Sequence, residues 1–173
     1  LRYLNSNQTI EDFQEAPSQA HIEARSRELP ANENTPETAG IRAGIIGWDV
    51  VDSPGKPSEQ FHTGGTLKVR FLVDVLSQVD ELQAGILIRT VEGVSAFGTS
   101  TLYHQKNYLN AVQGNRLRFE FEIKAELCAG SYFITLAIAD AISHSDMLYL
   151  DRKTDVIIVK ISQPRILASG IAM

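Results

Sequence analysis

The sequence predicts an all-β fold: an antiparallel β-sandwich of the jelly-roll or immunoglobulin-like type, with about eight strands. Three observations predict it. Apolar and polar residues alternate along short runs from Ile41 onward, turn residues separate these runs at regular spacing, and no long helical pattern interrupts them. With 173 residues, 43% of them hydrophobic, the chain is long enough to bury a core without disulfide bonds.

Residues 1–40 are predicted to form a linker or tether outside this core. They are polar, include Pro17, Pro30 and Pro36, and carry seven acidic and three basic residues. Such a segment has too little apolar surface to drive its own folding. Residues 41–173 carry 14 acidic and 13 basic residues, so no large basic face predicts nucleic acid as a partner.

The sandwich is expected over residues 41–163, where each strand follows from a local pattern. Thr66–Val75 alternates strictly, and its apolar residues face one side. Tyr132–Ala139 is apolar on both faces, which indicates a central strand. Pro164 ends the series and leaves residues 164–173 as a tail. The other predicted strands are Ile41–Val51, Gln83–Val91, Val94–Thr101, Arg116–Lys124, Met147–Leu150 and Thr154–Ile161.

The patterns of common catalytic and metal sites are not met. Before Gly55-Lys56, Val50 stands where a P-loop needs glycine, and Pro57 follows where it needs Ser or Thr. The four histidines and the single cysteine lack the spacing of a metal-ligand set. We therefore expect no cofactor, no bound metal and no catalytic centre in this chain.

Charged residues that face outward on three predicted strands form the candidate binding surface. If these strands share a sheet, several guanidinium groups lie on one face, and such groups suit sugar hydroxyls, carboxylates and phosphates. An ordinary solvated face explains the same pattern. The candidates on the strands are Lys68, Arg70, Arg89, Arg118 and Glu120.

Two carboxylates on one of these strands allow a second interpretation. Glu120 and Glu122 stand two residues apart, as a glycoside hydrolase could use them. They alternate with Arg118 and Lys124, however, which favours mutual neutralisation on an exposed face.

The segment Tyr103–Asn110 combines two tyrosines with amide and imidazole side chains. Sugar sites often pair aromatic faces with planar hydrogen-bonding groups, so Tyr103, His104 and Gln105 are expected at the rim of a glycan groove. The alternative is a polar connection whose tyrosines fold back onto the core.

A series of motifs across residues 41–161 resembles one known family. The motifs are Phe61–Phe71, Ala84–Thr90, Glu92-Gly93, Phe97–Thr101, Leu127 and Gly130–Tyr132. The resemblance is to the C-terminal carbohydrate-binding domain of the ATPase subunit of O-antigen polysaccharide ABC exporters, the Wzt family. Gly65 and Ser100-Thr101 depart from the common family pattern. The glycines within these motifs are interpreted as turn or close-packing residues.

The resemblance implies a non-catalytic module that binds the capped non-reducing end of a lipid-linked O-antigen polysaccharide and so licenses export. Implied partners are a nucleotide-binding ATPase domain of the same chain, the membrane permease and a second copy in a homodimer. Its implied place is the cytoplasmic face of the bacterial inner membrane. Because it begins with Leu1, we expect a fragment of a larger protein. A structural oligomerisation domain, using Ile157–Ile161 or residues 166–173 as its contact, is the alternative.

Overall fold

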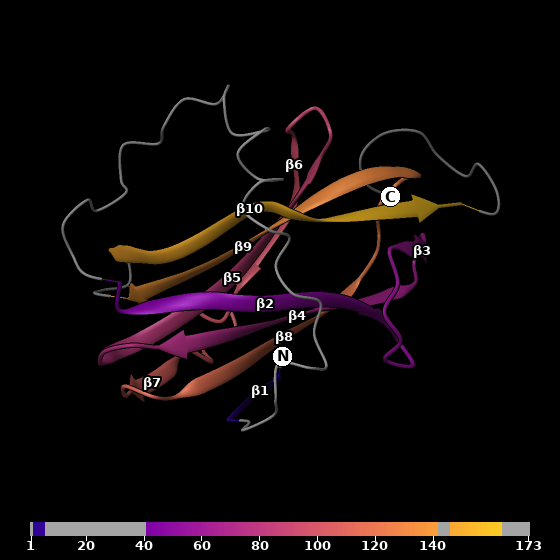
Figure 1. Ribbon diagram of the computed structural model, residues 1–173. Coiled ribbons are helices and arrows are strands. Elements are labelled where there is room, and N and C mark those ends of the chain that lie inside the picture. Colours follow the sequence, from indigo (N-terminus) through magenta and orange to yellow (C-terminus); the bar gives the residue numbers. More distant parts are fainter. Residues whose placement is uncertain (1, 6–40, 142–145, 164–173) are drawn as a thin grey trace, which may run out of the picture.

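The computed structural model describes residues 2–5, 41–141 and 146–163, and these form two β-sheets packed face to face. Figure 1 shows the two layers, with β10, β9 and β5 in one and β2, β4 and β8 in the other. The predicted β-sandwich is confirmed. The strands are β1 (Arg2–Asn5), β2 (Ala43–Asp52), β3 (Gln60–His62), β4 (Thr66–Val75), β5 (Val79–Thr90), β6 (Ser95–Ser100), β7 (Tyr108–Ala111), β8 (Arg116–Lys124), β9 (Gly130–Ala141) and β10 (Met147–Ser162).

The sheets differ in size and order. The four-stranded sheet has the order β1-β8-β4-β2, and the six-stranded sheet has the order β3-β10-β9-β5-β6, with β7 also paired to β5. Most pairs are antiparallel, as predicted, while the short strand β3 runs parallel to β10. Strand β9 lies between β10 and β5, so its predicted central position is confirmed.

The core lies between the sheets and follows from the alternation of apolar residues. Phe71 of β4 stacks on Phe119 and Phe121 of β8, with ring centroids 5.5 and 6.1 Å apart. All three rings are at most 1% exposed, so they remove a large apolar area from water. The six-stranded sheet packs its inward residues onto them, among them Leu82, Ala84, Ile86, Ile88, Ile134, Leu136 and Ile138.

Two predictions about the strands need correction. The described residues form ten strands rather than eight, because β1, β3 and β7 are too short for alternation to show. The predicted strands Met147–Leu150 and Thr154–Ile161 are one strand, β10, with register shifts between Tyr149 and Asp151 and between Lys153 and Ile157. Between the two shifts, the polar residues Asp151, Arg152 and Lys153 remain paired with β9.

Strand β1 comes from the segment predicted to be a tether. Its residues pair with β8 at one edge of the four-stranded sheet, from Arg2 opposite Glu120 to Asn5 opposite Leu117. The rest of the predicted tether, residues 6–40, and the predicted tail, residues 164–173, lie outside the described residues. Within the described ranges, no helix has the length and apolar character needed to span a membrane.

Candidate functional site

The most promising site is a hollow of about 310 Å³ on the outer face of the six-stranded sheet. We name it the outer hollow. Its walls and floor come from β5, β6, β9 and β10, together with Tyr103 from the connection after β6. A volume of this size lies at the lower end of the range found for small-ligand sites.

Strand register explains why the sheet is hollowed here. Arg152 of β10 lies opposite Ala137 of β9, which lies opposite Gly85 of β5. Gly85 in turn lies opposite Ser100 of β6. Since directly opposed residues point to the same face, this row has a long side chain at one margin and only small residues in its middle.

A neighbouring row repeats the arrangement. Tyr149 of β10 lies opposite Ala139 of β9, and Ala139 lies opposite Gln83 of β5. On the β6 side Gly98 continues the floor, and an added Cβ there would lie 3.3 Å from a methyl carbon of Leu87. The trough therefore exists because small residues, Gly85, Ala137 and Ala139, occupy neighbouring outward positions of the central strands.

Two residues that line the outer hollow each have a buried polar atom without a hydrogen-bond partner among the described residues. The atoms are Oε1 of Gln83 and Oγ of Ser100, in residues only 8% and 7% exposed. Buried polar atoms in native proteins are nearly always paired, because an unpaired one costs about 1–3 kcal/mol. An amide oxygen and a hydroxyl left unpaired in one hollow are suited to hydrogen-bond a polar ligand.

The three residues predicted at the rim of a groove, Tyr103, His104 and Gln105, occupy different places relative to the outer hollow. Tyr103 lines the outer hollow and is 77% exposed. Beside it, His104 Nε2 lies 3.1 Å from Oγ1 of Thr99, which also lines the hollow. Gln105 has a positive φ of 52° and its backbone closes a turn onto Leu102 with a 2.9 Å hydrogen bond, so it shapes the loop rather than the hollow.

The other predicted site residues lie on the opposite face of the sandwich. Lys68, Arg70, Arg118 and Glu120 all belong to β4 or β8 in the four-stranded sheet. The prediction that these residues share one face with Arg89 is wrong, because Arg89 lies on β5 in the six-stranded sheet. Spacing along a chain cannot reveal which strands share a sheet, and this is why the grouping failed.

Carboxylates neutralise the cations of that opposite face. Arg70 donates from Nε to Oδ1 of Asp49 at 2.7 Å and makes a second contact through Nη2. Lys68 Nζ lies 3.3 Å from Glu122, and Arg118 Nη2 lies 3.6 Å from Glu120. The face is a ladder of paired charges, as the solvated-face interpretation of Glu120 and Glu122 proposed.

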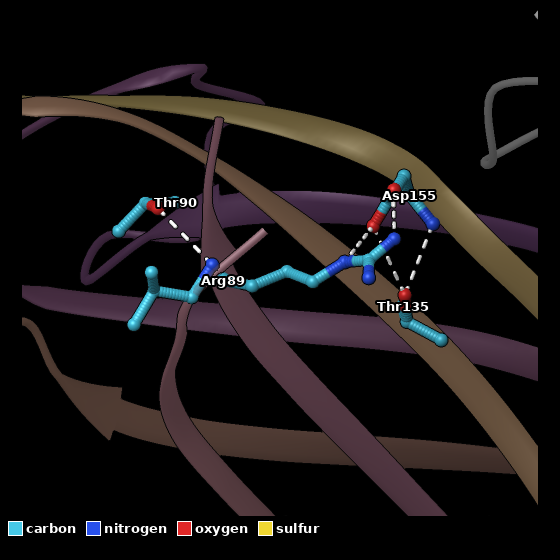
Figure 2. A network of polar contacts seen from close by, with 5 residues as sticks. Arg89, Thr90, Thr135 and Asp155 are labelled. Atoms are coloured by element: carbon cyan, nitrogen blue, oxygen red, sulfur yellow. Dashed lines mark hydrogen bonds and ion pairs between the residues drawn. The ribbon is translucent and has the colours of Figure 1, made fainter. Parts of the chain in front are cut away.

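Arg89 takes part in a network at one end of the outer hollow, shown in Figure 2. It donates from Nε to Oδ1 of Asp155 at 2.8 Å and contacts Oδ2 through Nη2. Thr135, which lines the hollow, donates to the same carboxylate at 3.2 Å and accepts from the backbone N–H of Asp155 at 3.0 Å. The hydrogen bond with Asp155 raises the pKa of Arg89 above its ordinary value, against the opposing effect of burial, and the negative charge of Asp155 adds to the rise.

Asp155 itself marks the second irregularity of β10. Its φ is 56°, in the left-handed region that Asp tolerates better than most residues. The network therefore holds a strained bulge in place. Arg89, a predicted candidate for ligand binding, is thus paired with a carboxylate of its own sheet.

A second hollow, of about 300 Å³, lies where β2 approaches β10 and the connection after β2. Its carboxylate Asp49 is already engaged by Arg70, and Trp48 is 5% exposed and packs into the core. Over residues 2–5, 41–141 and 146–163, no three His, Cys, Asp or Glu side chains cluster as metal ligands would. The unpaired polar atoms single out the outer hollow.

Sequence reasoning missed most of the residues that build this site. Gln83, Tyr149 and Arg152 belong to no motif, and Ser100 was noted only as a departure from a family pattern. The register of four strands brings these residues together. One signal was present: glycine inside a strand often marks the close approach of another group. At Gly85, an added Cβ would lie 3.3 Å from both Ser100 Cβ and the Thr99 carbonyl oxygen.

The chain is similar to proteins of one described family. A family model described as the Wzt C-terminal domain matches residues 39–172. The crystal structure of the C-terminal domain of Wzt superposes with a TM-score of 0.71 at 22% identity, over 80% of this chain and 86% of that one. Among curated proteins, none matches the chain.

Weaker structural similarities also occur. A putative β-galactosidase from Bacteroides fragilis gives a TM-score of 0.40 at 14% identity, over 62% of this chain and 16% of that one. A CARDB domain from Pyrococcus furiosus, solved in complex with di-metal ions, gives 0.41 at 11% identity, over 78% of this chain and 100% of that one. Similarities this low carry no argument about function.

Proposed function

We propose that this chain, which belongs to the Wzt C-terminal domain family, is a non-catalytic carbohydrate-binding module. Its ligand in this proposal is the capped non-reducing end of a lipid-linked O-antigen polysaccharide, and binding licenses export by an ABC transporter. The ATPase domain of the same chain, the membrane permease and a second copy are its proposed partners. Its proposed place is the cytoplasmic face of the inner membrane.

One observation carries the proposal of a binding site: Gln83 and Ser100 both line the outer hollow, and each has a buried polar atom, Oε1 and Oγ, without a hydrogen-bond partner among the described residues. A sugar ring offers several hydroxyls that can donate to an amide oxygen and exchange hydrogen bonds with a serine. Tyr103 and Tyr149, which also line the hollow, supply aromatic surface of the kind that packs on the apolar side of a pyranose.

The makeup of the outer hollow also supports a non-catalytic role. Glycoside hydrolysis needs a pair of carboxylates on either side of the scissile bond. None of the described residues that line the hollow is Asp or Glu. The predicted alternative pair, Glu120 and Glu122, lies on the four-stranded sheet and is engaged with Arg118 and Lys68.

The test is binding of capped and uncapped O-polysaccharide to the ¹⁵N-labelled protein, followed by NMR chemical shifts. We expect cap-dependent shifts at the amides of β5 and β6, and a loss of affinity of about tenfold in Gln83→Met or Ser100→Ala, since each removes one hydrogen bond. Gln113→Met is the matched control, because Gln113 is exposed beside the Gly114 turn, away from the hollow.

Absence of binding to any capped glycan would overturn the proposal and favour the oligomerisation domain. That alternative has less support from the described residues, because Ile157 and Ile161 are 6% and 1% exposed and only Ile158, at 49%, offers an apolar contact. Residues 166–173, its other proposed contact, lie outside the described residues. Sedimentation at increasing concentration would measure self-association directly.

A further inference from the structure

The outer hollow has a single charged residue among its described lining, Arg152. It lies on β10 at the margin of the trough, opposite Ala137. Its side chain is exposed and makes no ion pair with any described residue. The hollow therefore carries one positive charge that no acidic residue of its own lining neutralises.

This sets Arg152 apart from the other arginines whose side chains the structure describes. Each of those forms an ion pair with a carboxylate of the same domain. Arg70, Arg89 and Arg116 do so through two hydrogen bonds each. The pairs are Arg42 with Asp140, Arg70 with Asp49, Arg89 with Asp155, Arg116 with Asp74 and Arg118 with Glu120.

The acidic residues closest to Arg152 in sequence are already engaged elsewhere. Asp151 accepts a 2.8 Å hydrogen bond from the Ile45 backbone N–H and lies 3.2 Å from Lys153 Nζ. Asp155 is held by Arg89 and Thr135 at the bulge (Figure 2). These contacts fix the backbone on both sides of Arg152 and leave its guanidinium group available to the hollow.

We propose that the outer hollow selects a glycan end that carries an anionic group, a carboxylate or a phosphate, and that Arg152 is the residue that reads this charge. The inference rests on the proposed function and adds the chemical class of its ligand. A guanidinium fork matches either anion with two parallel hydrogen bonds, and a pre-positioned backbone lowers the entropy lost on binding.

The geometry supports contacts at both margins of the trough by one ligand. Arg152 and Ser100 stand in one row, three strand spacings apart, which is about 14 Å. A sugar that lies over Ala137 and Gly85 can therefore reach Ser100 on one side while its anionic substituent points toward Arg152. No side chain of this row blocks the arrangement, because only Ala137 and Gly85 stand between Arg152 and Ser100.

The experiment compares three small probes by NMR titration of the ¹⁵N-labelled protein: methyl glucoside, methyl glucuronide and glucose 6-phosphate. We expect both anionic probes to bind about tenfold or more tightly than the neutral one, and added salt to reduce this difference. The two anionic arms distinguish a carboxylate-bearing sugar from a phosphorylated one.

Two variants and one control locate the effect. Arg152→Gln should abolish the preference for anionic probes while leaving weak binding of methyl glucoside, and Arg152→Lys should keep part of the preference because it keeps the charge. Lys160→Gln removes one positive charge from an exposed position of the same strand outside the hollow and should change nothing.

The outcomes separate the two proposals. Equal binding of neutral and anionic probes, or an unchanged preference in Arg152→Gln, would overturn the role of Arg152 and leave the glycan site standing. If none of the three probes, and no capped polysaccharide, shifts the amides of Gln83 and Ser100, the glycan site itself is wrong and this inference fails with it.

Discussion

The pairing of Arg89 with Asp155 gives the sharpest test of the architecture around the outer hollow. The change is Arg89→Met, which keeps most of the side chain's length and apolar stem but removes the guanidinium group. Asp155 would then keep only its contacts with Thr135, at a backbone position with a φ of 56°. We expect the bulge of β10 to loosen and the protein to become less stable.

The magnitude follows from the contacts and their exposure. The pair is bidentate, which strengthens it, but its side chains remain 19% and 27% exposed, which weakens it by solvent screening. We therefore expect the free energy of unfolding to fall by about 1–2 kcal/mol, within the range for hydrogen bonds to charged groups that stay partly solvated. With a typical urea slope of about 2 kcal/mol/M, the midpoint should fall by about 0.5–1 M.

The assay is urea unfolding followed by fluorescence, for which Trp48 is a well-placed probe because it is the chain's single tryptophan and is 5% exposed. A double-mutant cycle with Asp155→Asn isolates the pair, since Asn tolerates the same φ and can still accept from Thr135. We expect a coupling energy of about 1 kcal/mol or more. A coupling near zero would show that the pair does not hold the bulge.

Two further predictions concern single residues of the six-stranded sheet. Burial raises the pKa of Tyr132 above its ordinary value of 10.0, so the stability linked to its neutral form is present below about pH 10 and is lost as pH rises through the higher folded-state value. Tyr132→Phe should therefore flatten the fall in the free energy of unfolding at alkaline pH. At pH 7 it should lower that free energy by about 1 kcal/mol, because it removes the 3.0 Å hydrogen bond to the Cys128 carbonyl. An unchanged alkaline limb of the pH–stability curve would contradict this. Gly85→Ala should cost about 1–2 kcal/mol in urea unfolding, because the new Cβ lies 3.3 Å from Ser100 and Thr99, and it should weaken glycan binding by raising the floor of the hollow. Gly114→Ala, at a φ of 87° in a turn outside the hollow, is its control: it should destabilise by strain alone and leave binding intact.

Much of the sandwich could be predicted because alternation is a local signal. The ten residues of Thr66–Val75 alternate with period two, and the structure buries Leu67, Val69 and Phe71 as that pattern requires. Prediction from the sequence fails where the pairing of strands overrides the local pattern of residues. Strand β10 continues through polar residues because its neighbour β9 keeps hydrogen-bonding it across two bulges, which no local rule predicts.

The site was less accessible to sequence reasoning than the fold. Arginines attracted attention as binding residues, yet Arg70 and Arg118 lie in pairs on the wrong sheet for the hollow, and Arg89 holds a bulge. Gln83 and Ser100, which matter most to the hollow, are distinguished only by one buried polar atom each that has no hydrogen-bond partner among the described residues. That property depends on three-dimensional surroundings, so it exists only once the strands are paired.

The two outer faces of the sandwich differ in a way that decides where a ligand can bind. On the four-stranded sheet, long charged side chains lie opposite one another across β4 and β8, as Lys68 does with Glu122, so the face is filled and neutralised. On the six-stranded sheet, Ala137 and Gly85 leave the backbone bare, and the unpaired groups stand at the margins. Binding at the first face would have to break existing ion pairs. The proposed binding at the second face would instead offer partners to Gln83 and Ser100, whose buried polar atoms have none among the described residues. This difference in cost, more than the number of arginines on either face, places the candidate site on the six-stranded sheet.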